Sequence, residues 1–207
     1  MAYPDLTTTS AVRSFLQKPA SDTAQDAIIA QLISRASLAI MRYTEREFIS
    51  AQPGTAQAPV ARTFEVELLR DGFLQLAPYD AQAGTITQVQ LDTDLATPRT
   101  LGSDEWRPWP IPARDGVTSA IRLIPTALGG FHRFRHRQVK VTAQWGWPSV
   151  PADIEHATIV TTAIWLRREI AAFSSTFRLD EDRVERPEIL PSSVRALLAH
   201  YKVQNQG

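Results

Sequence analysis

Residues 139–168 pass from a strand pattern directly into a helix pattern. Val139, Val141 and Ala143 alternate with polar residues, which is the two-residue period of a half-buried strand. Gly146 breaks that run, and Pro151 suits the first position of a helix because proline has no amide hydrogen to satisfy there. An apolar stripe then recurs every three or four residues, at Ile154, Ala157, Thr161, Ile164 and Trp165. A β module is therefore joined to a helix over residues 150–173 without a linker.

Three further segments carry helical patterns. Residues 10–17 predict a short helix, and residues 22–47 predict a long one. Asp22 and Gln25 have the spacing of a capping box at the start of the long helix. A final helix follows Ser192, because apolar residues recur there at helical spacing. These patterns predict a helical core built from both ends of the chain.

The middle of the chain carries strand patterns. Alternation over residues 64–69, a turn at Asp71 and Gly72, and an apolar run at residues 73–76 predict a hairpin. We expect further strands at residues 85–91, 100–106, 120–124 and 138–145. Residues 50–60 are rich in Pro, Gly and Ala and predict a flexible connection. The predicted fold class is α+β, with a helical core (1–50 and 149–207, including a C-terminal arm) and an inserted antiparallel β lobe (61–148).

Composition excludes several classes of protein. The chain has 207 residues, no cysteine and a formal net charge of zero, so disulfides and cysteine zinc sites are impossible. No run approaches the roughly 20 apolar residues that a membrane span requires, and the first residues lack a signal-peptide pattern. We therefore expect a soluble protein that is made in the cytoplasm and has no membrane partner.

The sequence offers no catalytic constellation. Its nine glycines form neither a dinucleotide-binding fingerprint nor a phosphate loop, and no serine lies in a nucleophile elbow. His132 and His136 are four residues apart, but a strand rather than a helix is predicted after them, which disfavours a metal site. We predict that the chain is not an enzyme and has no cofactor, metal or catalytic residue.

A basic, aromatic loop is the main electrostatic feature. Residues 117–152 contain no acidic side chain. The loop's basic side chains are Arg133, Arg135, Arg137 and Lys140, interleaved with Phe131 and Phe134. Such a loop can contact phosphates and stack on bases, or it can contact another subunit. Neutral total charge favours a solvated loop or a subunit contact over a dedicated nucleic-acid surface.

Two other segments are candidates for contacts with partners. Trp109 lies in a proline-stiffened loop and is the best candidate for an exposed interface anchor. Residues 178–188 carry eight charges in eleven positions. Such a segment can be a simple solvated linker, or an arm that folds when it binds a partner.

The order of the segments resembles the head-tail adaptor, or connector, proteins of long-tailed bacteriophages and gene transfer agents. The first matching block contains Ile33, Ala36, Tyr43, Thr44, Arg46 and Phe48. The second contains Val141, Gly146, Val150, Pro151, Ile154 and Ala157. The third contains Leu190, Pro191, Val194, Leu197, Leu198 and Tyr201. These blocks cover most of the helical part, whereas the β lobe matches only in its general pattern.

The resemblance implies a structural virion protein without catalysis. Its members bind the portal protein, assemble with copies of themselves in a ring, typically a dodecamer, and extend the channel for double-stranded DNA toward a stopper or tail-completion protein. Made in the cytoplasm of the bacterial host, such a protein is incorporated in the virion neck. By the same resemblance, the portal contact of this chain would comprise Leu190, Val194, Leu197, Leu198, Tyr201 and Lys202.

Two alternatives stay open. One is a neck stopper or tail-completion protein. The other, from a different class, is a small nucleic-acid-binding module that uses the basic loop at residues 131–140.

Overall fold

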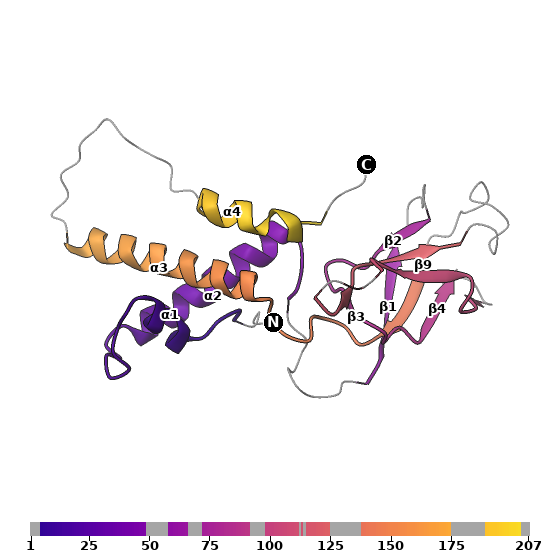
Figure 1. Ribbon diagram of the computed structural model, residues 1–207, viewed down its shortest axis with the longest axis horizontal. Coiled ribbons are helices and arrows are strands. Elements are labelled where there is room, and N and C mark those ends of the chain that lie inside the picture. The colour runs from indigo at the N-terminus through magenta and orange to yellow at the C-terminus, as the bar shows by residue number, and fades with distance from the viewer. Residues whose placement is uncertain are drawn as a thin grey trace. The chain divides into compact units, whose positions relative to one another are not determined.

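The computed structural model describes residues 5–48, 58–65, 72–91, 98–111, 113, 115–124, 138–174 and 189–203, with the side chains of residues 171–174 excepted. The chain divides into two compact units, shown in Figure 1. A helical unit comprises residues 1–45 and 150–207, and a β unit comprises residues 46–149.

The helical unit contains four α-helices among its described residues. They are α1 (Thr9–Phe15), α2 (Asp26–Thr44), α3 (Ala152–Ser174) and α4 (Ser192–Leu198), and a 3-10 turn (Ala199–Tyr201) continues from α4. Thr8 caps α1 because its side-chain oxygen accepts a hydrogen bond from the amide of Ala11. The left-handed conformation of Glu45 (φ 57°) ends α2.

Apolar faces of three helices form the core of the helical unit. Val12 of α1, Leu166 of α3 and three residues of α2 are buried together in one cluster. The members from α2 are Ile29, Leu32 and Ile33. Burial continues along the same face of α2 to Thr44. The backbone of Thr44 also accepts a hydrogen bond from the amide of Val203 (3.1 Å), which ties the C-terminal segment to the end of α2.

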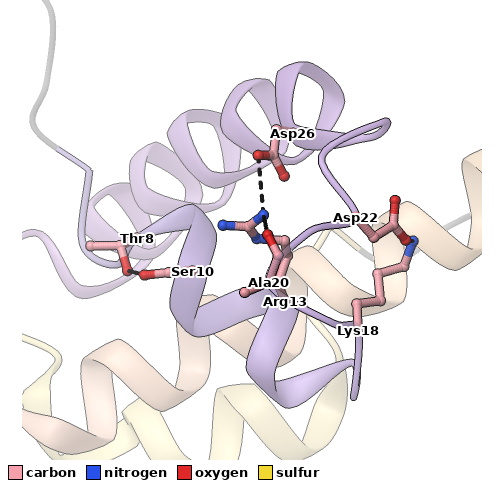
Figure 2. A network of polar contacts seen from close by, with 7 residues as sticks. All are labelled: Thr8, Ser10, Arg13, Lys18, Ala20, Asp22 and Asp26. Carbon is pink, nitrogen blue, oxygen red and sulfur yellow. Dashed lines mark hydrogen bonds and ion pairs between the residues drawn. The ribbon is translucent and has the colours of Figure 1, made fainter.

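The connection between α1 and α2 is held by polar side chains (Figure 2). The guanidinium of Arg13 donates to the carbonyl of Ala20 (2.9 Å) and pairs with Asp26 (3.5 Å). Lys18 pairs with Asp22 (3.1 Å) and donates to Gln25 (2.8 Å). The predicted capping box is therefore wrong: both of its side chains bind Lys18, Gln25 makes no capping bond, and α2 begins at Asp26.

The β unit contains three antiparallel sheets among its described residues. The four-stranded sheet has the order β1 (Val60–Glu65), β9 (Gln138–Ala143), β4 (Gln88–Leu91), β5 (Arg99–Thr100). The three-stranded sheet has the order β2 (Phe73–Gln75), β8 (Ala120–Leu123), β6 (Trp106–Trp109). The third sheet pairs β3 (Ala81–Gln82) with β7 (Val117–Thr118).

Strand β9 is central to the packing of the β unit. Its even-numbered side chains are half-buried, while Val139, Val141 and Ala143 are fully buried, as the alternation predicts. They belong to one core cluster with residues of β2, β4 and β8. Leu74, Val89 and Ile121 are examples from those three strands.

Most of the first strand of the predicted hairpin (64–76) lies outside the described residues, so the hairpin stays a prediction. Of the described residues, Phe64 and Glu65 belong to β1, which pairs with β9, and β2 pairs with β8. Gly72 nevertheless has the positive φ (74°) that a turn there requires. The α+β class and the antiparallel pairing are confirmed. No helix within the described residues is long and apolar enough to cross a membrane.

Candidate interaction surfaces

The C-terminal helix presents a narrower surface than the sequence suggested. Four of the six predicted portal-contact residues are buried inside the helical unit, namely Leu190, Val194, Leu198 and Tyr201. Leu197 is half-buried and Lys202 is exposed. The apolar stripe of α4 therefore packs inward, and the outer face of α4 is the part that a partner can reach.

Trp109 is exposed on the three-stranded sheet. Its side chain retains 44% of its accessible surface, and its ring packs edge-on against Phe73 at a centroid distance of 5.5 Å. The guanidinium of Arg122 lies over the Phe73 ring, 5.5 Å from its centroid. Arg107 of β6 stands directly opposite Arg122 in the strand register. The sheet face thus combines two aromatic rings with two cross-strand arginines.

Lys140 lies on the polar side of the four-stranded sheet. Its neighbours in the register are Thr63 of β1 and Gln90 of β4, neither of which carries a charge. Arg133, Arg135 and Arg137, the other predicted basic contacts, lie outside the described residues.

The sequence reasoning missed a buried ionic cluster in the β unit. Asp80, which is 0% exposed, pairs with the guanidinium of Arg46 and accepts a hydrogen bond from the indole nitrogen of Trp147 (3.1 Å). Phe48 packs on the Trp147 ring at a centroid distance of 5.3 Å. Burial raises the pKa of the Asp80 carboxyl, while the charge of Arg46 and the hydrogen bonds from Arg46 and Trp147 oppose that rise.

Backbone hydrogen bonds hold the segments around this cluster. The amide of Gly146 donates to the carbonyls of Tyr79 (3.0 Å) and Asp80 (2.9 Å), and the amide of Glu47 donates to Pro78 (2.8 Å). The first and last segments of the β unit are therefore both bound to the loop that contains Asp80. Within the described residues, no group of three or more potential metal ligands is found.

Comparison with known proteins gives one family. A family model described as "Head completion protein" matches residues 5–203. No curated protein matches the chain. Among solved structures, a chain from the "Neck of empty GTA particle computed with C6 symmetry" is 19% identical, with a TM-score of 0.48, and the match covers 96% of this chain and 91% of that one. Because the family model spans nearly the whole sequence, the chain belongs to the head completion protein family, which confirms the resemblance to phage connector proteins and indicates a structural role in head completion.

Proposed function

We propose that this protein is a head-tail adaptor, which assembles as a ring on the portal and extends the DNA channel toward the stopper or tail. The observation that carries the proposal is the family match over residues 5–203, which includes both helical segments and the β unit between them. The protein would be made in the cytoplasm of the bacterial host and incorporated in the neck. Its partners would be the portal protein, a stopper or tail-completion protein, copies of itself and passing double-stranded DNA.

The portal contact in this proposal is the outer face of α4. Val194 and Leu198 face the core, so the side chains available to a partner are those between them on the opposite side of the helix. Ser193, Ala196 and His200 are exposed there, and Leu197 and Lys202 are the members of the predicted contact that remain accessible. Ala196 and Leu197 leave the centre of this face without charged or bulky groups, so another protein surface can approach it closely.

Co-expression with the portal protein of the same particle tests the proposal. We expect native mass spectrometry and negative-stain imaging to show portal rings that carry a ring of this protein. Ala196→Glu should abolish the complex, because it places a charge at the centre of the contact. Gln31→Glu, on the exposed side of α2, is the matched control and should leave the complex intact.

Two outcomes would contradict the proposal. Absence of any complex with the portal would refute the adaptor assignment, whereas a monomer in isolation would not, because the portal can be the template for the ring. A ring that binds the tail protein but never the portal would favour a stopper or tail-completion protein.

A further inference from the structure

The helical unit contains a groove that is separate from its core and from the outer face of α4. One stripe of α2 lines it, at Arg35, Leu38, Ala39, Arg42 and Tyr43. Trp165 of α3 lines it from a second side, and Ile189, Leu190 and Arg195 line it from a third. Its volume is about 660 Å³, within the range of about 300–1,000 Å³ that is usual for binding sites. This stripe of α2 adjoins the buried stripe that faces the core.

The groove has an apolar floor and a cationic rim. Leu38, Trp165 and Leu190 supply carbon surface, while three arginines and no carboxylate are among the lining residues that the structure describes. Arg35 pairs with Glu169 at 3.7 Å, but the two side chains are 70% and 40% exposed, so this pair contributes little and can exchange partners. Among the residues that the structure describes, Arg42 has no ion-pair partner.

The spacing of Arg35 and Arg42 selects a particular shape of ligand. They are seven residues apart on one helix, which separates them by about two turns, or about 10 Å. A second helix lying along α2 presents side chains with the same separation. The negative end of the helix dipole lies at the C-terminus of α2 and stabilises the positive charge of Arg42. Arg35 lies in mid-helix, where the dipole has no such effect.

We infer that this groove binds an acidic amphipathic helix of a partner protein. Two carboxylates of the bound helix, two turns apart, would meet Arg35 and Arg42, because guanidinium groups pair with carboxylates in bidentate geometry. An apolar side chain between those carboxylates would fill the floor against Leu38 and Trp165. The aliphatic side chains of Leu38 and Leu190 on the floor favour a peptide over a nucleic acid, whose sugars and phosphates would gain nothing from them. The inference goes beyond the adaptor role and stands independently of portal binding.

The test uses the full-length protein and a synthetic probe. The probe is a fluorescein-labelled helical peptide with glutamates seven residues apart and leucines on the same face between them. A control peptide carries glutamine in place of each glutamate. We expect fluorescence anisotropy to show about tenfold tighter binding of the acidic peptide, with a preference that declines as salt is added.

Two variants of the protein locate the site. Arg42→Glu should weaken the affinity for the acidic peptide about tenfold. It should also strengthen the affinity for a peptide with lysines in place of the glutamates, and a loss of fold cannot produce this exchange of preference. Arg167→Glu is the matched control: Arg167 is exposed on α3 and lies two residues from Trp165, on the opposite side of that helix. It should leave the affinity unchanged.

Several results would overturn the inference. Equal affinity for the acidic and glutamine peptides, or no effect of Arg42→Glu, would remove the carboxylate recognition. Stronger binding of a fluorescein-labelled single-stranded oligonucleotide at the same groove would assign the arginines to phosphates. A change in the oligomeric state of the Arg42→Glu protein without peptide would assign the groove to a second copy of this chain.

Discussion

At the scale of single residues, Asp80 joins segments that are far apart in the sequence. Arg46 lies 34 positions before it and Trp147 lies 67 positions after it, and both side chains meet the same buried carboxylate. Replacing Asp80 with alanine would remove its ion pair with the Arg46 guanidinium, whose side chain is 12% exposed. We expect the unfolding free energy of Asp80→Ala to fall by about 3 kcal/mol or more, as measured by urea denaturation. A loss comparable to that of an exposed-site variant such as Gln75→Ala would contradict this role.

The titration of Asp80 predicts how stability changes with pH. Burial raises the pKa of the folded carboxyl above its ordinary value of 3.8, so between these two values the folded protein holds a proton that the unfolded chain releases. The stabilisation is fully present below the ordinary pKa and is lost as pH rises through the raised one. Relative to Asp80→Asn, which cannot titrate, the wild type should therefore gain unfolding free energy as pH falls through the raised pKa. The opposite trend in urea denaturation would show that Arg46, and not burial, dominates.

A comparison of two glycines distinguishes the cost of backbone strain from the cost of side-chain crowding. Gly84 and Gly116 have nearly equal positive φ angles (74° and 75°), which cost an ordinary residue about 1–2 kcal/mol. A Cβ at Gly84 would meet nothing within 4 Å, whereas one at Gly116 would lie 3.1 Å from Cγ of Pro148. Gly116→Ala should thus lose more unfolding free energy than Gly84→Ala in thermal and urea denaturation. Equal losses would show that Pro148 moves aside without cost.

Residue-level prediction from the sequence works where the cause is local. The alternation of Val139, Val141 and Ala143 predicts their burial, because side chains of successive strand residues point to opposite faces. The burial of Asp80 has no local signal, since it depends on side chains brought together by the fold. The groove between α2, α3 and α4 could not be predicted for the same reason. In the sequence, Arg35 and Arg42 are ordinary charged residues of a helix, and only the fold brings Trp165 beside them.

At the scale of elements, α4 provides a direct test of which face packs inward. Leu198 is fully buried and its neighbour Leu197 is half-buried. Leu198→Ala should lower the unfolding free energy by about 2–5 kcal/mol, because it leaves a cavity in the core, and Leu197→Ala should cost clearly less. Urea denaturation monitored by circular dichroism measures both. A larger loss of unfolding free energy for Leu197→Ala would mean that α4 packs with Leu197, and not Leu198, toward the core.

The partner of β1 shows why the existence of a strand is easier to predict than its pairing. Asp71 and Gly72 have the composition of a tight turn, yet the partner of β1 is β9, which follows it by more than seventy residues. Side-chain contacts favour this distant pairing: the Trp145 indole donates to the carbonyl of Val60 (2.7 Å), and the Arg62 guanidinium lies 3.6 Å from the Tyr79 ring centroid. The residue types at a turn predict only the local backbone, so they cannot predict contacts between residues that are far apart in the sequence.

The helix boundary error has a similar cause. Asp22 and Gln25 fit the spacing of a capping box, but the ammonium group of Lys18 binds both side chains. A cation four residues before Asp22 competes with the backbone amides for the carboxylate. Lys18→Met would free Asp22 and Gln25, so we expect α2 to gain residues at its start, measurable as additional helical Cα chemical shifts in NMR spectra. Unchanged shifts at residues 22–25 would mean that the backbone there does not depend on Lys18.

At the scale of the whole molecule, the chain builds one unit from its two ends and a second from its middle. The β unit has its own apolar cluster, which includes Leu76, Leu91 and Leu123, and its own ionic cluster around Asp80. Contacts within residues 46–149 therefore include the packing of this apolar cluster and the ion pair between Arg46 and Asp80. An inserted unit with a complete core of this kind can fold without the segments that flank it.

We therefore expect a fragment of residues 46–149 to fold alone. Arg46 and Trp147, near its two ends, both bind Asp80, so the fragment keeps the contacts that hold its ends together. It should show dispersed amide resonances, a single cooperative urea transition and buried tryptophan fluorescence. The same fragment with Asp80→Ala should unfold at lower urea, because the ionic cluster stabilises the fragment as it stabilises the full chain. A fragment with collapsed, poorly dispersed resonances would mean that the β unit depends on the helical unit for its fold.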